Sequence, residues 1–320
     1  MPPGLNGLAK PAPELTVVSP VYGCRGCLEE LVDRVSAAAG TAVASCEILL
    51  VDDASPDDAW SRIEELAQTH PEVRGLRLSR NFGQHAAISA GLAHATGRMI
   101  VVMDCDLQDI PEEIPALLAA LGQGVDVVLA SRTERQDSIL KKASSRTFYR
   151  LLGWLTGSVY DPTTANFGAY SRKVIDAVNA MPEADRFFPL LVRWTGFRSA
   201  LVPVEHGRRT EGRSGYSLRQ LLRLATNVAL SFSDKPLRLV VKMGLGFAVL
   251  SLCIVAMAVF KYAAGDIAVA GFTSIIASIW LVGGAIVSSI GIVGLYVGKL
   301  HGQVKNRPNY IIAEDTGDRP

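Results

Sequence analysis

Short apolar runs rich in β-branched residues alternate with helix-length amphipathic segments through the first 130 or so residues of the chain. The apolar runs predict strands at residues 15–18, 47–51, 73–78, 99–103 and 126–130. The segments between them predict helices at residues 28–39, 59–68, 84–95 and 112–121. Strands that alternate with helices indicate an α/β fold, in which a mostly parallel sheet is covered on both faces.

The pattern changes in the second half of the chain. Residues 166–170 and 199–204 are two further strand candidates that would complete the sheet. Residues 217–235 have leucines on one face and arginines on another, which predicts an amphipathic helix at a membrane surface; a helix that packs on the core is the alternative. Residues 243–260 and 267–297 carry no charge, and the longer run exceeds the ~20 residues that cross a bilayer.

Basic residues flank the two uncharged runs. The loop between the runs holds only Lys261 against Asp266, so both flanks should face the cytoplasm. The flanking basic residues are Lys235, Arg238, Lys242, Lys299, Lys305 and Arg307. Glycines in the second run permit close helix approach and make a homo-oligomer plausible. We therefore expect a multi-pass membrane protein whose soluble part faces the cytoplasm.

Composition narrows the possible functions. The 32 basic and 31 acidic residues give a net charge of +1, so the sequence offers no basic surface for nucleic acid. The five cysteines are scattered and no signal peptide precedes residue 15, which argues against a disulfide framework. Cys24 and Cys27 are interpreted as ordinary thiols at a helix start. The expected organisation is a flexible leader (1–13), an α/β domain (14–216), the amphipathic helix (217–235), a transmembrane hairpin (236–300) and a cytoplasmic tail (301–320).

Acidic residues follow the fourth predicted strand directly, in the sequence Asp104-Cys105-Asp106-Leu107-Gln108-Asp109. Two carboxylates one residue apart at the carboxyl end of a strand can share Mg²⁺ or Mn²⁺, which in turn binds a diphosphate. Oxygen ligands do not distinguish the two metals. A solvated acidic loop is the alternative.

The first two strands also end in candidate ligands. Ser19-Pro20-Val21-Tyr22 ends the first strand and provides an aromatic ring, and the second ends in Asp52-Asp53. A nucleobase needs stacking and an acceptor for a ring N–H group, which these residues can supply. Alternatively, either aspartate caps the next helix.

The motifs SPVY, VDDAS, LSRNFGQHAAISAGL and MDCDLQD, in this order, resemble the inverting family 2 glycosyltransferases of the GT-A fold. Within that family the chain is most similar to polyprenyl-phosphate glycosyltransferases, which include dolichol-phosphate mannosyltransferases and the undecaprenyl-phosphate formamido-arabinose transferases. The similarity covers about residues 15–310 and includes the two expected membrane spans. It implies transfer of one sugar from a nucleotide sugar, of the UDP type, to a polyprenyl phosphate. It also implies a tetramer in the cell inner membrane, multi-pass and with the catalytic domain in the cytoplasm.

The resemblance further implies roles for individual residues. Pro20, Tyr22 and Asp53 would hold the base, and Arg80 would support the nucleotide. Asp104, Asp106 and Gln108 would form the metal–diphosphate site, with Asp106 as the first candidate for a direct ligand. The residues that would bind the acceptor phosphate are Arg132, Lys141, Arg146, Arg209 and Arg213.

The chain departs from the family pattern at one position associated with a catalytic base. Relatives read Asp-Phe-x-Leu-x-Asp-Arg where this chain has residues 166–172, so Ser171 replaces an acidic residue. A phosphate monoester is largely dianionic at neutral pH, with a second pKa of about 6, so it needs no base to become a nucleophile. Two alternatives are a processive polysaccharide synthase and an inactive, transferase-like membrane scaffold.

Overall fold

The structure is a computed structural model, and it describes residues 12–132, 164–183, 186–204, 272–305 and 307–318, with scattered positions between 237 and 260. The chain divides into two compact units. The first contains the sheet and takes in the C-terminal residues from Arg307 onward, and the second contains the long apolar helix.

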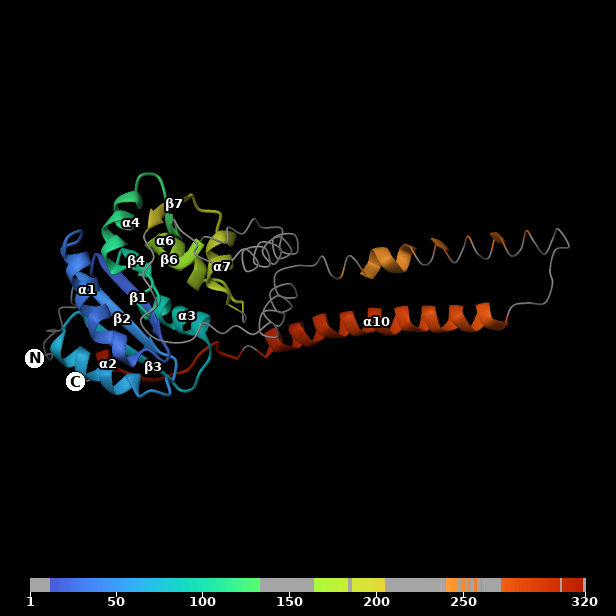
Figure 1. The fold of residues 1–320 in the computed structure, drawn as a ribbon, viewed down its shortest axis with the longest axis horizontal. Helices are drawn as coiled ribbons and strands as arrows, with labels where there is room; N and C mark the ends of the chain where they lie inside the picture. Colours follow the sequence, from blue (N-terminus) through green and yellow to red (C-terminus); the bar gives the residue numbers. More distant parts are fainter. Residues whose placement is uncertain are drawn as a thin grey trace, which may run out of the picture. The chain divides into compact units, whose positions relative to one another are not determined.

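The first unit is built on an eight-stranded sheet with the order β7-β5-β6-β4-β1-β2-β3-β8 (Figure 1). Pairs β1–β2, β1–β4, β2–β3 and β5–β7 are parallel, whereas β6 runs antiparallel to β4 and β5, and β8 antiparallel to β3. The expected α/β fold with a mostly parallel sheet is therefore confirmed. The strands are β1 (Leu15–Val21), β2 (Cys46–Asp52), β3 (Val73–Leu78), β4 (Met99–Val102), β5 (Val127–Arg132), β6 (Thr164–Ser171), β7 (Ser199–Val204) and β8 (Ile312–Asp315).

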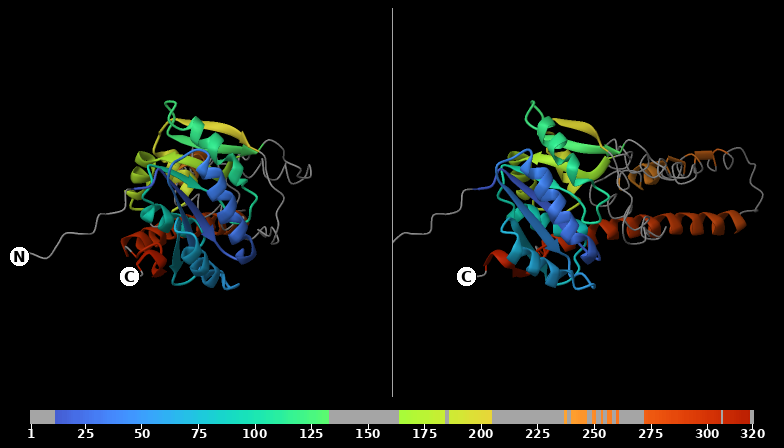
Figure 2. Two further views of the ribbon diagram at one scale, coloured as in Figure 1. Left: turned by 90° about the vertical axis from the view of Figure 1, so that its left-hand side faces the viewer. Right: turned by 60° about the vertical axis from the view of Figure 1, so that its left-hand side comes forward.

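Helices cover both faces of this sheet (Figure 2). On one face α1 contacts α2 and α4, and on the other α3 contacts α6 and α7. Gly91 in α3 lets that helix approach the sheet, because a Cβ there would lie 2.3 Å from a methyl group of Val18. The helices are α1 (Leu28–Gly40), α2 (Ala59–Thr69), α3 (Gln84–His94), α4 (Ile114–Ala120), α6 (Arg172–Asn179) and α7 (Phe188–Trp194).

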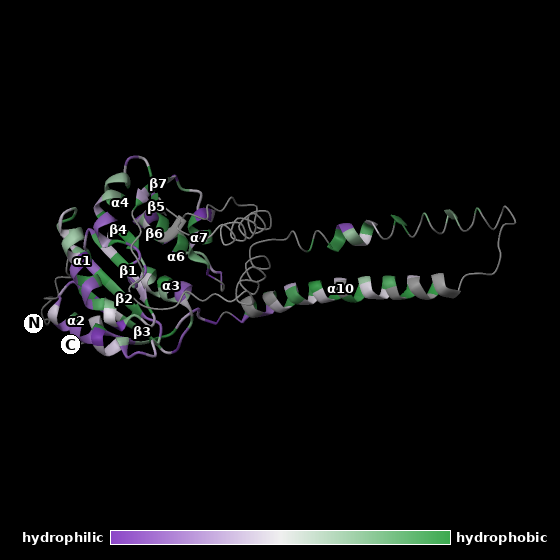
Figure 3. Cartoon of the chain, viewed as in Figure 1, coloured by the Kyte–Doolittle hydropathy of each residue, from purple (hydrophilic) through white to green (hydrophobic). Residues whose placement is uncertain are grey.

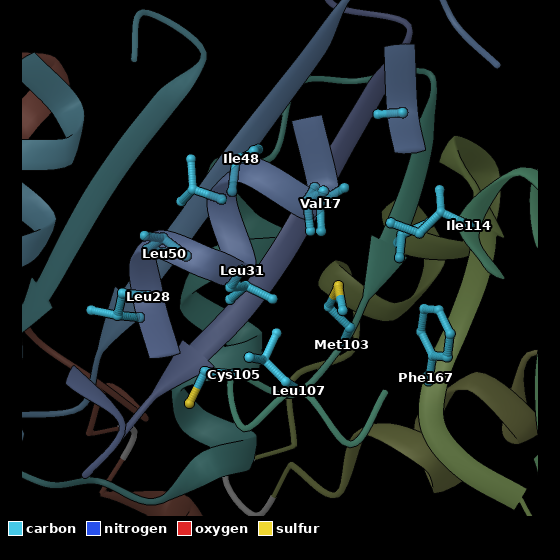
Figure 4. Close-up of a cluster of buried hydrophobic side chains, with 14 of the residues drawn as sticks. Val17, Leu28, Leu31, Ile48, Leu50, Met103, Cys105, Leu107, Ile114 and Phe167 are labelled. Atoms are coloured by element: carbon cyan, nitrogen blue, oxygen red, sulfur yellow. The ribbon is translucent and has the colours of Figure 1, made fainter. Parts of the chain in front are cut away.

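The main apolar core lies between the sheet and α1. Val17, Ile48 and Leu50 from the strands pack against Leu28 and Leu31 of that helix, all of them fully buried (Figure 4). Central strands buried on both faces read as continuous apolar runs, which is why β1 and β2 were recognisable from the sequence alone.

The C-terminal segment, expected to be a cytoplasmic tail, forms strand β8 at the edge of the sheet and a turn of 3-10 helix (Thr316–Asp318). The Arg74 guanidinium donates to both carboxylate oxygens of Asp315, at 3.0 and 2.6 Å, and the Gly75 amide donates to the Thr316 hydroxyl at 2.9 Å. These residues are 241 positions apart in the sequence, so nothing local in the sequence announces the pairing.

The second unit contains α10 (Phe272–Val304), which is apolar around most of its circumference (Figure 3). Its segment Leu281–Gly298 is the one stretch, among the described residues, that is long and apolar enough to cross a membrane. Only isolated positions of the first expected span, residues 243–260, are described, and the expected amphipathic helix at 217–235 lies outside the described residues. Both stay predictions.

Candidate active site

The candidate site lies at the edge of the sheet where the parallel strands end. Val21 at the end of β1 pairs with Asp52 at the end of β2, and Arg132 at the end of β5 pairs with Val204 at the end of β7. The antiparallel strands β6 and β8 begin at this same edge, since Thr164 pairs with Ser131 and Ile312 with Leu78. The loops that follow the strands therefore collect polar side chains along one edge.

The loop after β4 holds the paired carboxylates and is ordered by its own hydrogen bonds. The Asp104 amide donates to Asp109, which is buried, at 3.1 Å, and the Gln108 amide donates to Asp106 at 3.2 Å. Leu107 between them has φ of 59°, a left-handed conformation that L-residues rarely adopt. Backbone strain of this kind persists only where the surroundings impose it, and it clusters at functional sites.

A neighbouring helix fixes the first of these carboxylates. Gln84, the first residue of α3, donates through Nε2 to Asp104 Oδ1 at 2.6 Å. The preceding Gly83 has φ of 97°, which a residue with a side chain would adopt only with strain. Gln84 and Asp109 belong to two of the motifs that resemble the family, but the sequence predicted no role for either. In the structure both position the acidic loop.

Asp53, expected to contact the base, is buried and bonded to backbone. Its two oxygens accept the amides of Phe82 and Gly83 at 2.7 and 2.8 Å. Burial raises the pKa of the Asp53 carboxyl, against the effect of these two hydrogen bonds. Asp53 therefore anchors the loop before α3 to the end of β2, and a contact with the base would use its remaining lone pairs.

The other residues expected at the nucleotide lie on the same edge. Tyr22 follows β1 directly and is 55% exposed, so its ring is open to a stacking partner, whereas Pro20 is buried within the strand. Arg80, which follows β3 closely, is exposed, and its guanidinium lies 3.9 Å from the centre of the Phe82 ring.

His85, the second residue of α3, packs against Phe187. Its ring centre lies 4.4 Å from that of Phe187, and burial lowers the pKa of His85 to about 4. The imidazole is therefore neutral at pH 7. Its Nδ1 atom has no hydrogen-bond partner within the part of the chain that the structure describes.

Of the residues expected to bind the acceptor phosphate, the described part of the chain includes only Arg132. Arg132 ends β5 at the site edge of the sheet. Lys141, Arg146, Arg209 and Arg213 lie outside the described residues. They belong to the two segments that leave the sheet after β5 and after β7, both at the site edge.

Ser171 does not lie at this edge. It pairs with Met99, the first residue of β4, whereas Asp104 follows the last residue of that strand. Its hydroxyl contacts Asp126 at 3.4 Å. The interpretation that Ser171 occupies the position of a catalytic base is therefore wrong. Asn166, at the other end of this motif, lies near the site edge, because β6 enters the sheet there.

The cysteines differ from the expectation as well. Cys24 is not an ordinary thiol, since it forms a disulfide with Cys105, the residue between Asp104 and Asp106. Their Cα atoms are 6.5 Å apart, within the range that a disulfide spans. Because the two cysteines are 81 residues apart, the sequence did not indicate their pairing, and Cys27 was the only cysteine close to Cys24 along the chain.

The donor set suits a hard divalent cation. Asp104 and Asp106 offer carboxylates one residue apart, and Gln108 offers an amide oxygen. Within the described residues no cluster of three or more His, Cys, Asp or Glu side chains could enclose a metal.

Comparison with known proteins decides the family. Residues 16–179 match the family described as glycosyl transferase family 2. The chain belongs to glycosyltransferase family 2. An undecaprenyl-phosphate 4-deoxy-4-formamido-L-arabinose transferase of Klebsiella pneumoniae is 36% identical over 94% of this chain and 93% of its own length. An uncharacterized glycosyltransferase of Synechocystis is 32% identical, over 94% and 95% respectively.

A mannosyltransferase of Pyrobaculum calidifontis aligns in space with 92% of this glycosyltransferase and 87% of its own chain, at 19% identity and a TM-score of 0.48. The family match and the relatives over the whole length show that the chain is an enzyme of the glycosyltransferase class. The family match runs from β1 to the end of α6, which includes every motif of the site edge up to the acidic loop.

Proposed function

We propose that this glycosyltransferase moves a single sugar from a nucleoside diphosphate, of the UDP type, to the phosphate of a polyprenyl lipid at the cytoplasmic face of the inner membrane. The observation that carries the proposal is the acidic loop after β4, because Asp104 and Asp106 lie at the same edge of the sheet as the exposed Tyr22, Arg80 and the end of β5 at Arg132. The similarity over the whole length to undecaprenyl-phosphate sugar transferases supports the lipid phosphate as acceptor.

The donor would lie across the ends of β1 to β4. Tyr22 would stack on the base, the Asp53-bonded loop would border it, and Arg80 would approach the phosphates. Asp104 and Asp106, with Gln108, would hold Mg²⁺ or Mn²⁺ against the diphosphate. When bound, the cation would stabilise negative charge on the departing nucleoside diphosphate.

The acceptor needs charge compensation more than a base. A phosphate dianion attacks the anomeric carbon directly in a single displacement that inverts its configuration. Arginine side chains bind phosphate through two parallel hydrogen bonds, and we assign this role to Arg132 and Arg209, assisted by Lys141, Arg146 and Arg213. Their task is to hold two anions together in the orientation for attack.

The path of the chain supports a membrane acceptor. The chain leaves the sheet after Arg132 and after Val204, and it returns at Thr164 and at Ile312, all at the site edge. Strand β8 follows α10 yet pairs with β3, so the chain must return to the side from which it left. If α10 crosses the bilayer, an even number of crossings is required, which agrees with a second span at residues 243–260.

The test is direct transfer with the full-length chain in detergent. Purified protein is incubated with undecaprenyl phosphate, Mn²⁺ or Mg²⁺, and a panel of radiolabelled UDP-, GDP- and dTDP-sugars. We expect one nucleotide class to give a single-sugar lipid product that is labile to mild acid, and excess chelator to abolish its formation. A processive synthase would give a polymer instead. No turnover with any donor, despite nucleotide binding, would indicate an inactive scaffold.

A further inference from the structure

The Cys24–Cys105 disulfide joins two loops of the candidate donor site. Cys24 lies two residues after Tyr22, in the loop between β1 and α1. Cys105 lies between the carboxylates of Asp104 and Asp106. The bond therefore connects the loop expected to meet the base with the loop expected to meet the diphosphate.

The disulfide is buried below these loops rather than exposed on them. Cys24 and Cys105 are 4% and 7% exposed, and both belong to the apolar cluster under α1. Figure 4 shows Cys105 beside Leu107 and close to the end of α1 that begins at Leu28. The polar residues of the acidic loop thus lie next to a buried apolar cluster that contains the disulfide.

The acidic loop is held by polar contacts as well as by the burial of Leu107 in the apolar cluster. After Met103, whose amide donates to the carbonyl of Val18 at 3.1 Å, the loop leaves the sheet. Its links include the hydrogen bond from Gln84 to Asp104 and hydrogen bonds within the loop itself. A covalent link to the neighbouring loop removes freedom that nucleotide binding would otherwise have to remove, so the linked form should bind more tightly.

The proposed cellular location makes this bond reversible. Disulfides are rare in a reducing cytoplasm, where those that form are usually transient and catalytic or redox-sensing. We propose that Cys24 and Cys105 are a redox modification site of the donor site, and that the disulfide form binds the nucleotide more tightly than the dithiol form. This inference rests on the proposed function, because it takes a nucleoside diphosphate as the ligand.

The chemistry is thiol–disulfide exchange with a low-molecular-weight disulfide, RSSR. One cysteine thiolate attacks RSSR and releases RS⁻, and the second thiolate attacks the resulting mixed disulfide and releases a second RS⁻. The two protein thiols are oxidised, RSSR is reduced to two RSH, and the two thiol protons end on the two leaving groups. A small thiol drives the same steps in reverse.

Linkage gives the proposal a second readout, which must agree with the first. If the disulfide raises the affinity for nucleotide by some factor, bound nucleotide must shift the disulfide–dithiol equilibrium toward the disulfide by the same factor. A purely structural cross-link, with no coupling to the site, would leave both quantities unchanged.

The experiment uses the full chain in detergent, oxidised or reduced, and titrates UDP and GDP, each with Mn²⁺, by calorimetry. Thiol alkylation and peptide mapping first establish which cysteines are paired. We expect a Cys24–Cys105 peptide and an affinity about fivefold higher in the oxidised protein, at the low end of typical coupling between sites. In a glutathione redox buffer, saturating nucleotide should shift the equilibrium constant between the disulfide and dithiol forms toward the disulfide by the same factor.

Two variants provide the controls. Cys24→Ser should bind like the reduced wild type under both conditions. Cys46→Ser, which changes a cysteine at the opposite end of the sheet, should keep the full redox response. Chemical reduction of the wild type tests the same point without a substitution, in case Cys24→Ser fails to fold.

Equal or weaker binding by the oxidised wild type would overturn the proposal, and so would a mapped disulfide between Cys24 and Cys27. A chain that forms the Cys24–Cys105 bond but binds neither nucleotide in either state would contradict the proposed donor as well. Binding without any redox response would contradict the present inference alone.

Discussion

Strands β1 to β4 and strands β5 to β8 share one sheet but are connected in different ways. The first four follow one another through single helices and lie side by side in parallel. We call this region the donor half. In the rest of the sheet, β6 inserts antiparallel between β4 and β5, and β8 returns from beyond α10 to pair with β3. Repeated βα units thus form the edge that we propose for the nucleotide, whereas long connections attach the remaining strands.

The largest expected effect lies in the donor half. Asp106→Asn should lower turnover roughly hundredfold, because loss of one carboxylate weakens the hold on the cation and hence on the leaving diphosphate. Initial rates of lipid-linked sugar formation at saturating donor, measured across a range of Mn²⁺ concentrations, give the result. Partial recovery at high Mn²⁺ is expected if weakened metal binding is the cause.

Asp58→Asn is the matched control for this change. Asp58 is a largely exposed aspartate at the start of α2 whose ion pair with Arg25 spans 3.6 Å, so its neutralisation should leave the rate near that of the wild type. The assignment of Asp106 is wrong if both variants keep rates within threefold of the wild type.

An intermediate effect is expected at the added edge strand, and on stability rather than turnover. Asp315 is largely buried and accepts two hydrogen bonds from Arg74. Asp315→Ala should lower the free energy of unfolding by about 2 kcal/mol, the scale of charge-assisted hydrogen bonds. Intrinsic fluorescence during heating of the full chain is a suitable measurement, since Trp60 lies in α2 against Gly75 of the neighbouring strand.

The pH dependence of this difference has a definite sign. Burial alone would raise the pKa of Asp315, but the hydrogen bonds from Arg74 and the Gly317 amide outweigh it and lower the pKa below 3.8. A carboxyl whose pKa is lower in the folded state stabilises the fold at pH values above its pKa in the unfolded state. That stabilisation is lost as the pH falls through its pKa in the folded state. The gap between wild type and Asp315→Ala should therefore narrow below about pH 4.

Glu314→Ala provides the comparison on the same strand. Glu314 is bonded to Arg77 at 2.7 Å, but both side chains are more than 40% exposed, and surface pairs contribute less than about 1 kcal/mol. If Glu314→Ala destabilises the chain as much as Asp315→Ala, the buried pair is not what secures β8.

Local patterns and long-range contacts differ in how far the sequence alone could predict them. Strands β1 to β4 and their helices were recognisable because each is a local pattern, and the roles proposed for Tyr22 and Asp106 follow from their positions directly after strands. The pairing of Cys24 with Cys105 and of Arg74 with Asp315 depends on contacts 81 and 241 residues apart, which no local pattern encodes. Asp53 was placed correctly at the edge, but its bonds to the amides of Phe82 and Gly83 depend on where the next loop folds.

The smallest effect is expected at Ser171, which the sequence interpretation already expected not to act as a base. Ser171 follows seven strand residues that run away from the site edge, and it ends beside Met99 at the opposite edge of the sheet. It precedes α6 without a side-chain hydrogen bond that caps the helix. Ser171→Ala should therefore change neither the rate of transfer nor its pH profile by more than about twofold, the effect typical of a substitution away from the site.

Asn166 tests the same strand from its other end. Since β6 enters the sheet at the site edge, Asn166→Ala should reduce the rate more than Ser171→Ala does, although both substitutions remove a small polar side chain. The two variants are compared by initial rates at subsaturating and saturating undecaprenyl phosphate, with thermal unfolding as a check on folding. A larger loss in Ser171→Ala, at unchanged stability, would mean that the acceptor approaches from the amino ends of the strands, and the assignment of the catalytic edge would have to be abandoned.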